Sequence, residues 1–208
     1  MTGDSGSKHR RRDVSRIEGF SDAVFAFAIT LLVLGFSLPA ERLTSNQSLA
    51  LALLAQWPSL IAYALSFAVI GIMWQNHHAL FRRVARIDRA TVYWNLLLLA
   101  GTAFIPFATS TLGRYPTMTA STFLYGLALS ETATCYNVML RHLARSGAFE
   151  QSVSGSTIAA TIRAYTTGWI TYALATLLAL VLPIASFAAY IVIAVYYLIP
   201  RGVDSDRA

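Results

Sequence analysis

The chain has 208 residues and carries little charge, since only 12% of its residues are Asp, Glu, Lys or Arg while 56% are hydrophobic. An ordinary soluble domain has about 25% charged residues. The composition therefore argues against a soluble protein and favours one whose surface faces lipid. The net charge is +6, but the basic residues lie between apolar runs and at the N-terminus, which indicates membrane topology rather than nucleic-acid binding.

The chain begins with a polar, basic segment at residues 1–13, which we predict to be disordered. Residues 14–200 are predicted to form an all-α integral membrane domain, because a spanning helix needs about 20 apolar residues. Residues 49–56 are expected to form an interfacial or protruding piece, and residues 201–208 a polar tail. The six predicted transmembrane helices cover residues 17–38, 57–81, 90–112, 118–140, 158–182 and 184–199.

The distribution of Lys and Arg predicts the orientation of these helices. With six spans, one side of the membrane holds both termini, the loop at 82–89 and the region at 141–163, and it carries 14 of the 16 Lys and Arg residues. The other side carries Arg42 and Arg114. Because short cytoplasmic segments are enriched in Lys and Arg, both termini are predicted to be cytoplasmic.

The first helix contains an acidic residue, Asp22, about 12 Å along the helix from the basic tail. An ionisable residue inside the membrane costs roughly 2.5–3.5 kcal/mol and marks a functional site or an interhelical contact. At about 100° per residue, Ser21 and Asp22 are predicted to face the protein's own bundle. An apolar stripe lies nearly opposite Asp22 and consists of Phe20, Val24, Phe27, Leu31 and Leu34.

Polar groups in the next two helices lie at the same depth as Asp22. Trp74 and His77 lie near the end of the second helix, and Asn95 lies near the start of the third. Buried polar groups require hydrogen-bond partners, so we predict an interhelical network. Arg16 lies about 120° around the helix from Asp22 and must find its partner on another helix.

Adjacent residues on a helix point about 100° apart, which argues against two kinds of chemistry. His77 and His78 cannot easily hold one metal ion together, since zinc pairs favour the i, i+4 spacing. Ser21 and Asp22 diverge in the same way and do not form a nucleophile and its base. We therefore expect no enzyme activity, no metal and no other cofactor.

The motifs of the first three helices resemble those of the transmembrane protein 175 family of lysosomal potassium channels, in its prokaryotic members. The first motif is Arg-x-x-x-Phe-Ser-Asp at residues 16–22, the second is Trp-x-x-His-His at residues 74–78, and the third combines Trp94-Asn95 with Phe-Ile-Pro-Phe at residues 104–107. The resemblance implies a multi-pass protein of a bacterial cell membrane. It further implies a homotetramer of six-helix subunits whose first helix lines a central pore.

By this resemblance, we expect a passive, potassium-permeable cation channel with no nucleic-acid partner. Its pore would be constricted by Phe27, Leu31 and Leu34, with the Thr30 hydroxyl within reach of a permeating ion. The family usually has Ile or Leu at the first constriction, whereas Phe27 could narrow the pore or offer a cation–π face. The residues expected to position the first helix are Arg16, Phe20, Ser21, Asp22, Trp74, His77 and Asn95.

Two alternatives to a potassium channel remain open. A proton-conducting channel could use Asp22, His77 and Glu131, a further acid within the fourth helix, as relays. A membrane assembly protein would instead conduct no ions.

Overall fold

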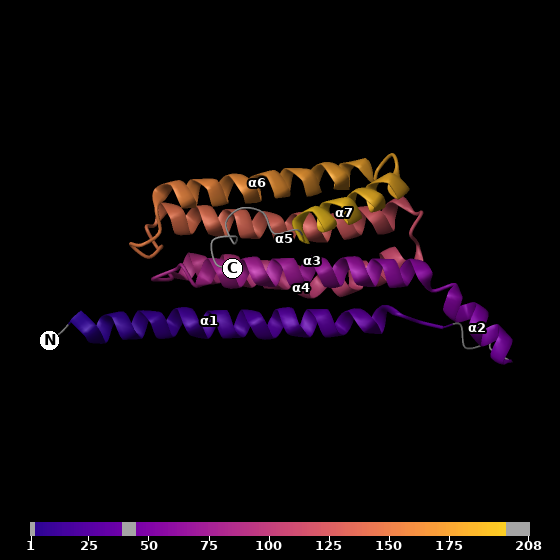
Figure 1. Ribbon diagram of the computed structural model, residues 1–208, viewed down its shortest axis with the longest axis horizontal. Helices are drawn as coiled ribbons and strands as arrows, with labels where there is room; N and C mark the ends of the chain where they lie inside the picture. Colours follow the sequence, from indigo (N-terminus) through magenta and orange to yellow (C-terminus); the bar gives the residue numbers. More distant parts are fainter. Residues whose placement is uncertain (1–2, 39–44, 199–208) are drawn as a thin grey trace.

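The computed structural model describes residues 3–38 and 45–198, with side chains described from Arg12 onward. The described chain is helical almost throughout (Figure 1). Its elements are α1 (Gly3–Leu31), η1 (Leu32–Gly35, a 3₁₀ turn), α2 (Asn46–Leu54), α3 (Trp57–Phe81), α4 (Arg89–Arg114), α5 (Thr119–Arg145), α6 (Gly155–Leu178) and α7 (Pro183–Leu198).

Side-chain caps explain where several helices begin. The Asp88 carboxylate accepts a hydrogen bond from the Thr91 backbone N–H before α4, and the Ser154 hydroxyl accepts one from Thr157 before α6. Such caps satisfy backbone N–H groups that have no partner inside the helix. As a result, α4 and α6 begin one and three residues before the predicted spans, whereas α3 coincides with the predicted span at 57–81.

The N-terminal segment differs from the expectation of disorder. Helix α1 begins at Gly3, so residues 3–13 continue the spanning helix instead of forming a separate tail. The segment contains no proline, and Lys and Arg are good helix formers. The expected tail at residues 201–208 lies outside the described residues.

Three helical segments in the described chain are long and apolar enough to cross a membrane, namely Arg12–Gly35, α3 and α4. Helix α7 is also apolar but shorter. The span of α5 carries Glu131 and that of α6 carries several threonines, which lowers their hydropathy. The count of six spans therefore remains a prediction, although a helix covers most of each predicted span.

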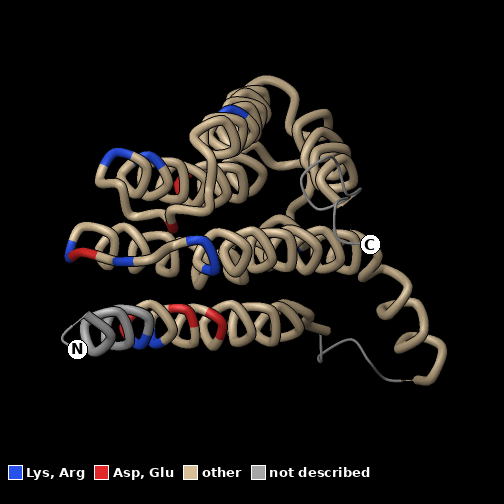
Figure 2. Tube along the Cα trace, turned by 60° about the vertical axis from the view of Figure 1, so that its left-hand side comes forward, with Lys and Arg blue, Asp and Glu red and all other residues tan. Residues whose placement is uncertain are grey.

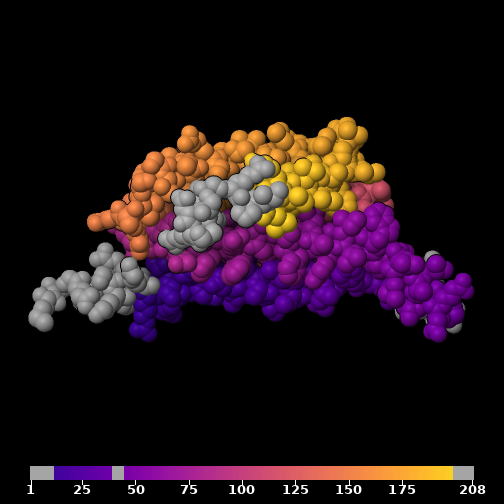
Figure 3. Space-filling model, in the orientation of Figure 1, coloured from indigo at the N-terminus to yellow at the C-terminus, as the bar shows by residue number. Residues whose placement is uncertain are grey.

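The helices are stacked in layers, with α1 at one face of the bundle and α6 at the other (Figure 1). Helix α1 packs against α3 and α4, α4 packs against α5, and α5 packs against α6. Helix α7 fills the space beside α3, α5 and α6. The space-filling view shows α1 along one edge of the molecule and α2 projecting from one end (Figure 3).

Inside the bundle, the helices are joined by hydrogen bonds as well as by apolar contacts. The Ser66 hydroxyl of α3 lies 2.7 Å from the Thr109 hydroxyl of α4 and 3.1 Å from the Tyr125 hydroxyl of α5. All three residues are buried. Polar contacts of this kind favour helix association in lipid, where apolar surfaces gain little by leaving the solvent.

Charged residues are unevenly distributed along the bundle. Most of the described Lys and Arg residues lie toward the end that holds the N-terminus (Figure 2). Arg114, at the end of α4, lies at the opposite end. This asymmetry follows the pattern from which the orientation was predicted.

Candidate functional site

Helix α1 has two faces with different surroundings. One face is buried against α3 and α4 and contains Val14, Ser21, Phe25, Ala28 and Leu32. These positions recur every three to seven residues, the spacing that places side chains along one side of a helix. The buried face therefore holds α1 to the bundle and fixes which side chains face outward.

The opposite face of α1 is not covered by any other part of the described chain. Phe27 is 65% exposed and Leu34 is 73% exposed, and Phe20 and Thr30 lie on the same side. Leu31 is half-buried at the edge of this face. The exposed Thr30 hydroxyl donates a hydrogen bond to the Phe27 carbonyl at 2.8 Å. We call Phe27, Thr30, Leu31 and Leu34 the outer stripe.

A series of hydrogen bonds holds the buried face of α1 against α3 and α4. His77 Nε2 lies 2.8 Å from Asn95 Oδ1, and Asn95 Nδ2 donates to Ser21 Oγ at 3.0 Å. Ser21 Oγ in turn donates to the Ile17 carbonyl at 2.9 Å. Since the Asn95 amide nitrogen is used as a donor, its oxygen must accept, so His77 carries its proton on Nε2. These hydrogen bonds link α3 to α4 and α4 to α1.

The residues in this series of hydrogen bonds are fully buried. Ser21, His77 and Asn95 are each at most 1% exposed. The His77 ring stacks on Phe81 with 4.3 Å between centroids and meets Phe25 edge-on at 5.4 Å. Because a buried polar group is costly without a partner, the hydrogen bonds and the aromatic enclosure together specify how α1 sits on α3 and α4.

Two further contacts between α1 and α3 lie beside this series of hydrogen bonds. Trp74 Nε1 donates to Asp22 Oδ1 at 2.9 Å, and His78 Nδ1 lies 2.8 Å from Glu18 Oε1. The Trp74 and His78 rings stack on each other. The two acids are four residues apart on α1 and their partners are four residues apart on α3, so the contacts repeat one helical turn later. We call these four residues together with Ser21, His77 and Asn95 the polar support.

The far end of α1 is held by different residues. After η1, the Ser37 hydroxyl accepts a hydrogen bond from Arg114 Nη2 at 2.7 Å, and the Ser37 carbonyl accepts one from Gln56 Nε2 at 3.1 Å. The outer stripe thus lies between two anchored ends, with the polar support at one end and the Ser37 contacts at the other.

Comparison with known proteins shows what the chain is similar to. A potassium channel of Streptomyces collinus is 40% identical to the chain over 187 residues, which is 88% of this chain and 90% of that protein. The family model described as endosomal/lysosomal potassium channel TMEM175 matches residues 16–106, which contain α3, about half of α1 and most of α4. The chain belongs to the TMEM175 family.

The TMEM175 fold is also found among solved structures. The crystal structure of a lysosomal potassium-selective channel TMEM175 homolog from Chamaesiphon minutus superimposes with a TM-score of 0.81 at 35% identity, over 90% of this chain and 97% of that one. The human endosomal/lysosomal proton channel TMEM175 is 37% identical over 117 residues, which is 52% of this chain but only 23% of the human protein.

The structure brings together most, but not all, of the residues that were predicted to hold α1 in position. Ser21, Asp22, Trp74, His77 and Asn95 form the contacts described above. Arg16 is exposed, and no hydrogen bond joins it to another described residue. Phe20 lies with the uncovered face of α1.

Sequence reasoning did not identify Glu18 and His78 as partners. A usable signal was present, because Glu18 precedes Asp22 by four residues and His78 follows Trp74 by the same interval. Once one contact between two such helices is predicted, the helical repeat predicts the next one.

Glu131 lies apart from the polar support and beyond the segment matched by the TMEM175 family model. It accepts a hydrogen bond from Cys135 Sγ at 3.1 Å, and its carboxylate fills the space over Gly101 of α4. Gly101 is six residues beyond Asn95, or roughly 9 Å further along the helix. Among the described residues, no group of three or more His, Cys, Asp or Glu side chains is placed to hold a metal ion.

Proposed function

We propose that this protein is a potassium-permeable cation channel that transports ions passively, as the names of its bacterial relatives suggest. The observation that carries the proposal is the combination of two faces on α1. One face is fixed by buried hydrogen bonds, while the other presents large apolar side chains that the rest of the chain leaves uncovered. A pore lined by this helix would have both a defined position and a defined constriction.

A single copy of α1 cannot enclose a pore, so the proposal requires several copies. We propose a homotetramer in which four outer stripes face a central axis. The exposed apolar surface of Phe27 and Leu34 supports this arrangement, because contiguous apolar surface that lacks a cover marks an interaction site. The number four is the one that the family resemblance implies.

The constriction would be formed by rings of Phe27, Leu31 and Leu34, which narrow the pore and repel water. An ion passing such rings must lose part of its hydration shell. Sodium holds its hydration water more strongly than potassium, which gives a modest preference for potassium. Phe27 adds an aromatic ring whose face can attract a cation, so the first ring differs in kind from the other two.

The proposed topology has six spans with both termini in the cytoplasm of a bacterial cell. The concentration of Lys and Arg at one end of the bundle supports it (Figure 2). Under this topology the polar support lies near the cytoplasmic end of the pore, and the Ser37 contacts lie near the external end.

The function is tested by reconstituting the purified protein into liposomes and measuring flux down a potassium gradient, a sodium gradient and a proton gradient. We expect potassium flux well above that of protein-free liposomes, with slower sodium flux. Absence of flux in all three gradients, from protein that is folded and tetrameric, would favour the non-conducting assembly protein instead.

A second candidate function is proton conduction. It is favoured by the human relative, which is named a proton channel, and by the titratable Asp22 and His77 next to α1. The two functions predict different reversal potentials. For a potassium channel the reversal potential follows the potassium gradient at constant pH, whereas for a proton channel it follows the pH gradient at constant potassium.

A further inference from the structure

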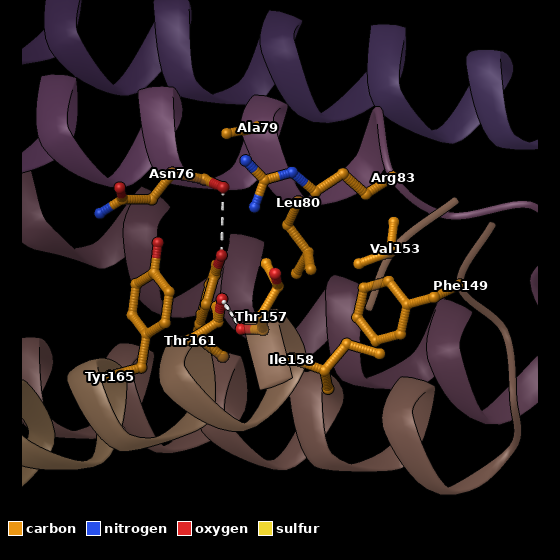
Figure 4. Close-up of a pocket in the computed structure, with 11 residues that line it drawn as sticks. Asn76, Ala79, Leu80, Arg83, Phe149, Val153, Thr157, Ile158, Thr161 and Tyr165 are labelled. Atoms are coloured by element: carbon orange, nitrogen blue, oxygen red, sulfur yellow. Dashed lines mark hydrogen bonds between the residues drawn. The ribbon is translucent and has the colours of Figure 1, made fainter. Parts of the chain in front are cut away.

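A second candidate site is a cavity at the basic end of the bundle. It is lined by residues of α3, α5 and α6 and of the loops that follow α3 and α5, and it is a partly open space of about 40 Å³. Figure 4 shows the side chains that border it. Helix α1 does not contribute to the lining residues, so this site is separate from the outer stripe.

Arg83 supplies the charge in this cavity. Its guanidinium reaches over the space from the loop that follows α3 (Figure 4), and the Asn76 backbone carbonyl accepts a hydrogen bond there from the Tyr136 hydroxyl at 3.1 Å. None of the described residues that line the cavity is acidic. A guanidinium presents five N–H donors in a fixed plane, a shape that matches the oxygens of a phosphate.

The backbone around Arg83 is held in place before any ligand binds. The Arg83 carbonyl accepts a hydrogen bond from the Glu150 backbone N–H at 2.9 Å, and the Arg83 N–H donates to the Leu80 carbonyl at 3.0 Å. Val84 pairs with Phe149 in a short antiparallel bridge. The two loops are thereby tied together, so the backbone that carries the Arg83 side chain is held in place.

One part of the wall is apolar, and the other part carries the Tyr136 and Thr161 hydroxyls, which donate hydrogen bonds to the backbone carbonyls of Asn76 and Thr157. Leu80, Phe149, Val153 and Ile158 line the cavity beside Arg83. Helix α3 ends at Phe81, so the cavity lies where a membrane-spanning helix gives way to a basic loop. A small soluble anion would use the guanidinium but leave these apolar walls uncovered. A phospholipid can place its phosphate at the guanidinium and its glycerol and acyl carbons against the apolar side chains.

We propose that this cavity binds the headgroup phosphate of an anionic phospholipid, with Arg83 as its principal contact and Ile158 and Phe149 against the apolar part of the lipid. Nearby cationic side chains raise the local concentration of anionic lipid; they are Arg82, Arg86, Arg141 and Arg145. The proposal depends only on the basic end lying at a membrane surface, and so it holds for either orientation of the chain and for a conducting or non-conducting protein.

The test compares Arg83→Gln with Arg82→Gln, because Arg82 is the adjacent arginine but is exposed and does not line the cavity. Wild type and both variants are purified from vesicles of phosphatidylethanolamine mixed with either phosphatidylglycerol or phosphatidylcholine. Native mass spectrometry then measures the lipid that each protein retains. Thermal melting shows whether each variant is folded.

We expect wild type and Arg82→Gln to retain phosphatidylglycerol in preference to phosphatidylcholine. Arg83→Gln should retain it at least about tenfold more weakly, which corresponds to about 1.4 kcal/mol. Should Arg83→Gln fail to fold, Arg83→Lys serves in its place. It keeps the charge but loses the planar pair of donors, so retention of phosphatidylglycerol should fall below that of both wild type and Arg82→Gln.

Three results would overturn the proposal. Equal losses in Arg82→Gln and Arg83→Gln would show attraction by the basic surface as a whole. Equal retention of the two lipids by wild type would show that headgroup charge does not matter. Displacement of phosphatidylglycerol by inorganic phosphate at millimolar concentration would show a site for a free anion instead of a lipid.

Discussion

At the scale of single residues, the polar support shows why Asp22 lies behind the outer stripe and not in it. Its carboxylate accepts a hydrogen bond from Trp74 on α3, and Ser21 beside it is bonded to Asn95 on α4. These bonds turn the polar side of α1 toward its own subunit. The most polar motif of the helix therefore positions the outer stripe without forming part of it.

Replacing Asp22 by Asn tests this division of roles. The Asn oxygen can still accept from Trp74 Nε1, but a charge-assisted hydrogen bond becomes a neutral one of roughly half the strength. We expect a smaller fraction of assembled tetramer or a lower open fraction, with an unchanged ratio of potassium to sodium permeability. Size-exclusion chromatography and bi-ionic reversal potentials measure the two effects. A change confined to selectivity would place Asp22 in the pore.

Asp88 gives a prediction about pH. Hydrogen bonds from the Thr91 backbone N–H and hydroxyl, with a smaller contribution from His142, lower the pKa of Asp88 from its ordinary value of 3.8 to about 2. A lowered pKa means that the ionised carboxylate stabilises the fold. That stabilisation is fully present above pH 3.8 and is lost as the pH falls from there to about 2.

Asp88→Ala should therefore lower the melting temperature at neutral pH, since loss of such a cap costs about 0.5–2 kcal/mol. The difference from wild type should shrink between pH 4 and pH 2. Asp88→Asn is the matched control, because Asn also caps helices and should retain much of the stability at neutral pH. A difference from wild type that stays constant down to pH 2 would argue against a role for the ionised cap.

At the scale of the helices, the spans could be predicted because lipid imposes a length on them. The span at 57–81 was predicted from hydropathy and proline position alone, and α3 covers the same residues. The start of α1 was not predicted, because a polar segment near a terminus indicates disorder only when no helix continues into it. The caps of α4 and α6 were missed because hydropathy does not register a hydrogen bond to a backbone N–H.

The direction of the outer stripe was predicted only in part. An angular count from Asp22 placed Leu31 near the middle of the stripe, whereas it lies half-buried at the edge. The count took Asp22 as the centre of the buried side, but that centre lies nearer Ser21 and Phe25. The regular helix also gives way to a 3₁₀ turn at Leu32, beyond which an angle of 100° per residue no longer holds.

Close packing between helices gives a prediction about Gly126. A methyl group added there would collide with the Tyr190 and Thr176 hydroxyls on α7 and α6, whereas one added at Gly71 would meet nothing within 4 Å. Ala is a better helix former than Gly by about 1 kcal/mol, so Gly71→Ala should keep or raise the melting temperature. Gly126→Ala should lower it. Equal melting temperatures for the two variants would contradict the packing of α5 against α6 and α7.

At the scale of the whole molecule, two surfaces of the chain await partners of different kinds. The outer stripe is apolar and lies on one edge of the bundle, where further copies of the chain would cover it (Figure 3). The cavity at Arg83 has a guanidinium on one side and apolar and hydroxyl-bearing side chains on the other, where a phospholipid would bind (Figure 4). The sequence predicted the first surface through a motif at known spacing. The second draws residues from three helices and two loops, and only the fold brings them together.

The central claim, that the outer stripe lines the pore, is tested most directly by potassium flux through Phe27→Ala tetramers in liposomes. Phe107→Ala is the matched control, because Phe107 is 59% exposed but lies on α4 and not on α1. Removing the Phe27 ring widens the first constriction, so we predict flux well above wild type for Phe27→Ala and flux equal to wild type for Phe107→Ala. Unchanged flux through folded, tetrameric Phe27→Ala would contradict the account.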